Sequence, residues 1–335
     1  MVKYIGLDAH SSTCTFCVTN EEGFEIDNTT IRTNGRLLIN YLRMINGYKR
    51  LTFEECELSS WLYEILGKEV DELIVCNPVY NREYKRRKTD KLDARKLAKL
   101  LRGGFLSSVF HNGRDREKFR GLMSAYTDLV VDSVRLKNRY KSIFRKEGNR
   151  IRGEKIYRDN KVLKEIKGKV YKFIGKELYA RINEIERRRK EYEREIKICS
   201  RPFKEIKMLK TIPGIGPIRA AQISAQVIYP KRFANKYKYY SYCGLVRHKR
   251  ISGDKEYGGN KIWGNRVLKN VYKMAAVDAL RGCNSLKKHY EYLRRKGVSD
   301  KNARNAISRK IAAISLSIWK NNCKYEDKRG RDIIE

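Results

Sequence analysis

Arg86-Arg87-Lys88-Thr89-Asp90-Lys91-Leu92-Asp93-Ala94-Arg95-Lys96-Leu97-Ala98-Lys99-Leu100-Leu101 is the stretch around which the chain is interpreted. Small and apolar residues recur in it at helical spacing, which predicts a helix with one buried stripe formed by Ala94, Leu97, Ala98 and Leu101. Asp90 and Asp93 extend this stripe by one turn. Both carboxylates are therefore expected to face the surface on which the helix packs.

The same stretch is strongly basic, with ten Lys or Arg and three acids between Arg82 and Arg102. Inward acids on a cationic helix suit an enzyme that holds Mg²⁺ against a nucleic-acid phosphate, with Arg86, Arg87 and Lys88 as candidate backbone contacts. The alternative is that both acids are ordinary helix-start residues paired with Lys91 and Arg95. This helix alone leaves both interpretations open.

Bulk properties point to the same class of partner. The 335-residue chain is long enough for two domains, and its net charge of +37 is spread along its whole length. Such a charge favours a polyanion, so nucleic acid is the expected partner. A membrane-spanning segment is not expected, because no apolar run approaches roughly 18 residues. The start of the sequence lacks a signal-peptide pattern, so the cytoplasm is the expected location.

The eight cysteines give no metal-binding signal. Cys14 and Cys17 form a lone C-x-x-C without a second pair at zinc spacing, and they fall in an expected strand. Reduced, partly buried thiols are therefore expected.

The first 112 residues read as an α/β domain. The expected elements, in chain order, are strands at Lys3–Asp8, Thr13–Thr19 and Phe24–Ile31, a helix at Arg36–Met44, a strand at Leu51–Glu54, a helical segment at Ser59–Gly67, a strand at Leu73–Cys76 and the Asp90/Asp93 helix. The first three strands predict an antiparallel meander, and the later crossovers predict parallel pairing. This order is that of an RNase H-like domain.

Two of these strands end in an acid, Asp8 and Glu54. In such a sheet both acids and the Asp90/Asp93 helix converge, and four carboxylates there would repel each other unless cations held them. Two Mg²⁺ ions about 4 Å apart would do so, with Mn²⁺ as the alternative ion. Glu54 is preferred to Glu55, which lies on the opposite face of an extended chain. Singly, Asp8 could be a turn former and Glu54 a surface residue.

Residues 113–203 predict a helical arm. Asp115–Glu147 and Val162–Lys197 are long, charged helical segments that could pair as an antiparallel coiled coil. An arm suits dimerisation or gripping a duplex, and a solvated spacer is the alternative.

The next region, residues 204–323, is expected to be mainly helical, with final helices at 267–281 and 302–320 and a disordered tail at 324–335. Met208–Ile223 has the form of a helix-hairpin-helix in which a helix ends at Pro213-Gly214 and another begins at Pro217 or Ile218. Backbone amides at such a turn bind phosphate without reading sequence, so Gly214, Gly216 and Arg219 are candidate contacts. A purely structural turn is the alternative.

Val246–Arg266 is basic and rich in glycine, with one central serine, Ser252. A flexible loop there could present a hydroxyl to a phosphate, but a polar hairpin with its turn at Ser252-Gly253 is an equal alternative. Candidate phosphate contacts in this segment are Arg247, Lys249, Arg250 and Lys255.

Together these stretches resemble the DEDD transposases of the insertion-sequence family numbered 110, relatives of the Piv DNA invertases. The matching N-terminal motifs are Tyr-Ile-Gly-Leu-Asp8-Ala-His, Phe53-Glu54-Glu55-Cys56 and Lys-Thr-Asp90-Lys-Leu-Asp93-Ala-Arg. The matching C-terminal motifs are Ile-Pro-Gly-Ile-Gly-Pro, Tyr-Cys-Gly-Leu, Ile-Ser252-Gly and Gly264-Asn265-Arg266. Glu55 departs from the small residue usual in the family.

The resemblance implies a recombinase in which Asp8, Glu54, Asp90 and Asp93 of a RuvC-like domain bind Mg²⁺. It implies that Ser252 attacks DNA to give a covalent phosphoserine link. It also implies a guiding bridge RNA and dimers that assemble into a tetrameric synapse on donor and target DNA. The residues leave two alternatives, a metal-only endonuclease or resolvase in which Ser252 is structural, and a non-catalytic nucleic-acid-binding protein.

Overall fold

The structure is a computed structural model that describes residues 1–78, 89–109, 114–149, 153–157, 159–246, 250–252, 255–257 and 264–327. The chain divides into two compact units, Met1–Glu117 and Lys118–Glu335. The first is a mixed α/β unit and the second is mostly helical. The arm helices and the C-terminal helices thus belong to one unit.

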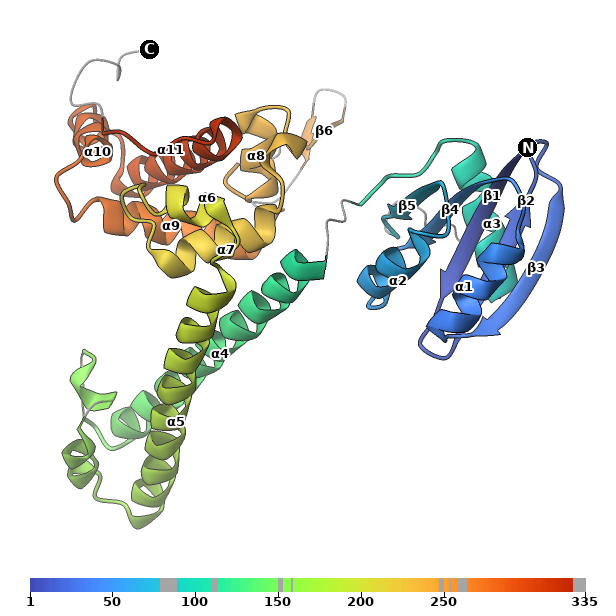
Figure 1. The fold of residues 1–335 in the computed structure, drawn as a ribbon. Helices are drawn as coiled ribbons and strands as arrows, with labels where there is room; N and C mark the ends of the chain where they lie inside the picture. Colours follow the sequence, from blue (N-terminus) through green and yellow to red (C-terminus); the bar gives the residue numbers. More distant parts are fainter. Residues whose placement is uncertain are drawn as a thin grey trace. The chain divides into compact units, whose positions relative to one another are not determined.

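The N-terminal unit is built on a five-stranded sheet with the order β3-β2-β1-β4-β5 (Figure 1). Its strands are β1 (Val2–Ala9), β2 (Thr13–Thr19), β3 (Glu25–Arg32), β4 (Tyr48–Glu54) and β5 (Glu72–Cys76). The first three pair antiparallel, whereas β4 lies parallel to β1 and β5 parallel to β4. The predicted meander and the predicted parallel half are both confirmed, and the topology is consistent with an RNase H-like start.

Side-chain alternation gives this sheet two different faces. One face carries Ile5, Leu7 and Phe53, which pack in a buried core with α1 (Gly35–Met44) and α2 (Ser59–Leu66). The other face is covered by α3 (Asp90–Arg102). Buried residues of α3 pack there against Cys17 of β2.

The predicted stripe of α3 is confirmed, because Ala94, Leu97, Ala98 and Leu101 are its buried residues. Thr89 caps the helix by accepting a hydrogen bond from the backbone N–H of Leu92 at 3.4 Å. This cap makes Asp90 the first helical residue and places its carboxylate at the helix N-terminus.

The C-terminal unit begins with two long helices, α4 (Arg114–Lys146) and α5 (Lys169–Cys199). They pair antiparallel, as hydrogen bonds from Tyr126 to Glu193 (2.8 Å) and from Ser133 to Glu186 (3.1 Å) show. The predicted second helix started too early. Residues Asn160–Glu165 form a 3₁₀ helix, η2, after a shorter one, η1 (Lys155–Tyr157).

The local sequence explains this correction. Asp159 caps η2 by accepting from the Lys161 backbone N–H, and Gly168, with extended backbone, is the N-cap of α5. Leu163 and Ile166 still pack inward at the distal end of the helix pair. Because both residues are apolar and fit helical spacing, the sequence pattern extended the predicted helix to them, although the backbone there is not α-helical.

The remaining elements form a helical cluster with a small hairpin (Figure 1). They are α6 (Lys204–Leu209), α7 (Pro217–Val227), η3 (Pro230–Arg232), α8 (Lys236–Tyr242), β6 (Arg250–Ser252), β7 (Lys255–Tyr257), α9 (Arg266–Ala279), α10 (Ser285–Arg295) and α11 (Asp300–Asn321). A buried chain of hydroxyls joins α8, α9 and α11, with Tyr239 to Tyr272 at 2.5 Å and Tyr272 to Ser315 at 2.7 Å. Burial raises the pKa of Tyr239 and of Tyr272, so both hydroxyls stay protonated.

Two expectations for this unit need correction. The first helix of the predicted helix-hairpin-helix ends at Leu209, four residues before Pro213, because the chain continues in turns. The expected tail also starts too early, since Tyr325 donates its backbone N–H to Thr211 Oγ1 at 2.8 Å and packs on the core. Tyr325 and Asp327 are therefore held against the unit, and residues 328–335 lie outside the described part.

Candidate active site

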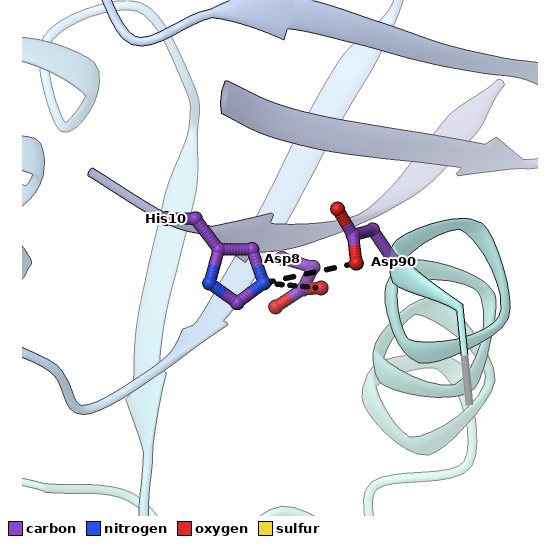
Figure 2. A group of neighbouring side chains, drawn as sticks. All are labelled: Asp8, His10 and Asp90. Atoms are coloured by element: carbon purple, nitrogen blue, oxygen red, sulfur yellow. Dashed lines mark hydrogen bonds and ion pairs between the residues drawn. The ribbon is translucent and has the colours of Figure 1, made fainter. Parts of the chain in front are cut away.

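Three side chains that could share a metal ion meet at the end of β1. Asp8, His10 and Asp90 each place one ligand atom within 4.8 Å of the other two. His10 Nε2 lies 3.2 Å from Asp8 Oδ2 and 3.9 Å from Asp90 Oδ1 (Figure 2). The cluster joins Asp8 of the first strand to Asp90, the first residue of α3, 82 positions later in the chain.

The sheet register places Glu54 on the same face as Asp8. Leu7 lies opposite Phe53 in the parallel β1–β4 pair, and both belong to the core on the other face. Asp8 and Glu54 are the next residues of these two strands, so alternation turns both toward the α3 face. Glu55 follows the end of β4, and its backbone N–H donates to the Cys76 carbonyl at 2.9 Å.

Asp93 lies one helical turn after Asp90 and is half-buried. Burial raises the pKa of Asp8 above its usual value, the nearby His10 lowers it, and the charges of Asp90 and Asp93 raise it again. Asp8 is half-buried, and a cation would relieve the repulsion between its carboxylate and the two like charges beside it. Three of the four predicted acids thus interact electrostatically, and the fourth has the register to join them.

His10 is a residue of this cluster that was not predicted as a ligand. Its signal was present in the sequence, because Asp8 and His10 are two positions apart and an extended chain turns such residues to one face. It was overlooked because a lone histidine beside an acid has no metal-binding spacing of its own. Its side chain is 56% exposed and remains accessible to substrate or metal.

Arg95 forms an ion pair with Glu25, a partner that was not among the helix acids Asp90 and Asp93 suggested by the sequence. Its guanidinium binds the Glu25 carboxylate of β3 through two hydrogen bonds, of 2.5 and 2.9 Å. The Arg95 hydrogen bonds lower the pKa of Glu25 to about 2. This pair ties α3 to the edge of the sheet, so Arg95 has a carboxylate partner other than the two helix acids.

The turn before α7 is held largely by contacts within the protein. Gly214 has φ +84°, and a Cβ atom there would lie 2.1 Å from the Ala275 carbonyl oxygen of α9. Arg219 donates to the Gly214 carbonyl at 2.8 Å and forms an ion pair with Asp278 at 2.6 Å. A Cβ on Gly216, the N-cap of α7, would meet no atom within 4 Å. Phosphate binding at this turn stays a prediction, with Gly216 the most open position.

Ser252 is the last residue of β6 and lies opposite Lys255 of β7 in an antiparallel pair. The two strands thus form a hairpin, which was the alternative to a flexible loop, and Ser252 is the last strand residue before the segment that connects β6 to β7. Arg250 and Lys255 begin β6 and β7. The other predicted phosphate contacts, Arg86, Arg87, Lys88, Arg247 and Lys249, lie outside the described residues.

Comparison with known families decides the identity. A family model for DEDD transposases of the IS110 group matches residues 5–147, and the transposase IS116/IS110/IS902 family matches residues 206–291. The chain belongs to the IS110 family of transposases. No curated protein matches the chain. The two matches cover the unit that carries the acids and the segment that carries Ser252.

The family assignment makes DNA the substrate of this transposase and indicates the use of a divalent metal. The cluster fits such an ion. Ligand atoms that share an ion with bonds of about 2.1 Å lie about 3 to 4 Å apart, which matches the separations between His10 and the two aspartates. The two carboxylates suit Mg²⁺ or Mn²⁺, and the imidazole favours Mn²⁺ of these two ions.

No helix in the described part of the transposase is both long and apolar enough to cross a membrane.

Proposed function

We propose that this transposase cuts and rejoins DNA strands through a covalent phosphoserine link at Ser252, with Mg²⁺ held by Asp8, Glu54, Asp90 and Asp93. The observation that carries the proposal is the meeting of Asp8 and Asp90, from distant parts of the chain, around one point at the end of β1. Asp8 is half-buried and Asp90 is exposed, and a divalent cation between their carboxylates would offset their mutual repulsion.

Each site residue has a distinct task in this proposal. The metal ions, when bound, supply Lewis-acid polarisation of the scissile phosphate. The acids hold those ions, and His10 serves as a further ligand. The basic residues Arg250 and Lys255 of the hairpin position the DNA backbone. The same role is proposed for Arg247 and Lys249, which precede β6 in the sequence, and for Arg86, Arg87 and Lys88, which precede α3 in the sequence.

Ser252 is the nucleophile. Its Oγ–phosphorus bond forms as the bond from phosphorus to a deoxyribose oxygen breaks, the serine proton passes to a base or water, and the leaving oxygen takes up a proton. A phosphate ester is exchanged for a phosphate ester, so a second deoxyribose hydroxyl can reverse the step on a new strand without an external energy source. Because the phosphate ester is conserved, this step allows the strands to be rejoined, whereas hydrolysis would leave them cut.

The remaining parts of the proposal concern the assembly. A bridge RNA pairs with donor and target DNA, so that base pairing supplies the sequence specificity of the reaction. The α4–α5 arm joins two protomers, and two dimers form the synapse, so that Ser252 of one subunit meets the acids of another. The charge of +37 allows one chain to hold both RNA and DNA.

The test is a covalent-adduct assay. Wild-type protein, incubated with its bound RNA, DNA carrying the element ends and Mg²⁺, is denatured and examined for protein-linked DNA. Ser252→Ala is expected to bind DNA without forming the adduct, while Ser107→Ala, at an exposed serine of the N-terminal unit, forms it normally. If Ser252→Ala still cuts DNA and Asp90→Asn does not, the metal-only nuclease would be favoured. An undiminished adduct would exclude Ser252.

A further inference from the structure

A basic cavity lies at the distal end of the α4–α5 arm, in a part of the chain to which the proposed function gives only a joining role. It has a volume of about 460 Å³, within the range of about 300 to 1,000 Å³ of ligand pockets. Residues of η2 and α5 line it: Lys161, Leu163, Lys164, Lys172, Lys176 and Tyr179.

The cavity carries positive charge without a matching negative charge. Four of its six lining residues are lysines, and no acid lines it. Among the residues that the structure describes, no carboxylate lies within 4.0 Å of these lysine amines. Lys172 and Lys176 are one turn apart on α5, so their ammonium groups share one side of the helix with Tyr179.

The rest of the arm does not share this imbalance. Between Lys137 and Lys176 the sequence has 15 Lys or Arg and four acids, whereas Glu177–Cys199 has seven and six. Ion pairs neutralise that second segment, for example Arg187 with Glu184 at 2.7 Å and Arg189 with Glu193 at 3.2 Å. The excess of positive charge is therefore concentrated at the end of the arm that is remote from the C-terminal helices.

The floor of the cavity is apolar and aromatic. Leu163 is 8% exposed and packs in the distal core, and Tyr179 packs partly against that core, 6.0 Å from Tyr140 between ring centroids. Lysine ammonium groups lining the same cavity as an aromatic ring and a leucine match the two parts of a nucleotide, a phosphate and a base or sugar face. A base inside a duplex has no free face to offer, so an unpaired nucleotide is favoured.

From this arrangement we infer that the tip of the arm binds an unpaired segment of nucleic acid, with a base against Tyr179 and Leu163 and the flanking phosphates between the lysines. Looped RNA and displaced single-stranded DNA offer the same chemistry. The inference adds a binding site to a transposase, and it does not depend on the Ser252 step, which has a separate assay.

The experiment compares two triple variants of the full-length protein. Lys164→Ala/Lys172→Ala/Lys176→Ala removes three charges at the tip. Lys118→Ala/Lys190→Ala/Lys197→Ala removes three exposed charges at the other end of the same two helices. Binding of fluorescent oligouridine RNA, oligothymidine DNA and duplex DNA is measured by anisotropy over a range of salt.

The tip variant is expected to bind single strands about tenfold more weakly and to lower the slope of log Kd against log salt by about 2, as the loss of three phosphate contacts requires. The matched variant should lose much less. Tyr179→Leu should weaken binding about tenfold with the salt slope unchanged. If the tip variant loses affinity for RNA alone, RNA is the occupant of the cavity. If it loses affinity for single-stranded DNA alone, single-stranded DNA is the occupant. Equal losses from the two triple variants, or an equal loss on duplex DNA, would overturn the inference.

Discussion

Gly6 of β1 and Ala94 of α3 are in direct backbone contact. A Cβ atom on Gly6 would lie 2.1 Å from the Ala94 carbonyl oxygen and 2.5 Å from the Ala98 backbone nitrogen. Only glycine allows α3 to approach the sheet this closely. Since Asp8 is two residues after Gly6 and Asp90 one turn before Ala94, the same contact fixes the distance between two acids of the candidate site.

Gly6→Ala should therefore damage both stability and metal binding. We expect the free energy of unfolding to fall by about 1–3 kcal/mol, because the added methyl group meets backbone that must shift. Affinity for Mn²⁺ should fall with it. Urea unfolding and Mn²⁺ titration measure the two effects. Gly121→Ala, where a Cβ would meet no atom within 4 Å, should leave metal binding unchanged and stability equal or slightly higher. Tight Mn²⁺ binding by Gly6→Ala would contradict the link.

His10 should favour transition metals in this site. Imidazole is a better ligand for Mn²⁺ than for Mg²⁺, which prefers oxygen. His10→Ala is expected to weaken Mn²⁺ binding about tenfold and Mg²⁺ binding less, as measured by electron paramagnetic resonance of Mn²⁺ with Mg²⁺ in competition. Ser12→Ala, at an exposed residue beside the site, is the control. Unchanged Mn²⁺ affinity would remove His10 from the ligand set.

The neighbouring acids Glu54 and Glu55 should differ sharply in importance. The β1–β4 register turns Glu54 to the face of Asp8 and Glu55 away from it. Glu54→Gln should lower metal-dependent DNA cleavage by about a hundredfold or more, since even outer partners of metal ligands are worth about 10- to 100-fold. Glu55→Gln is the matched control and should stay within a few-fold of wild type. The reverse order would move the ligand to Glu55.

The Glu25–Arg95 pair should make the N-terminal unit sensitive to acid. Arg95 lowers the pKa of Glu25 from 4.5 to about 2, so the folded state holds this proton less tightly than the unfolded state. The stabilisation is complete above pH 4.5 and is lost as pH falls toward about 2. Urea unfolding at a series of pH values should show the gap between wild type and Glu25→Gln closing over this range. For Glu22→Gln, at an exposed residue, the free energy of unfolding should change with pH in the same way as for the wild type. A gap that is independent of pH would show that the pair does not couple folding to protonation.

The sequence alone was enough for the elements whose signals are local. Strand alternation and the apolar stripe of α3 depend on residues within a few positions of each other, and the structure confirms the expected sheet and helix. Helices α8 and α10 were not predicted, since Tyr239 and Leu286 are the only buried residues that they contribute. Both helices are short and mainly polar or rich in tyrosine, and they were not interpreted as helical although the spacing of residues in α10 is amphipathic. Asn235 and Asn284 cap these helices, and tertiary packing completes them.

Pairings between distant parts of the chain were decided only by the tertiary structure. The sequence marks Asp8 and Asp90 as candidates, but it does not show that His10 lies between them or that Arg95 binds Glu25. It also marks Gly214 as a phosphate-binding glycine, whereas close packing on Ala275 already requires glycine there. Composition and spacing describe each residue and its neighbours along the chain. The contacts that give these residues their roles form when the sheet and helices pack, because only then do groups many residues apart come within a few ångströms.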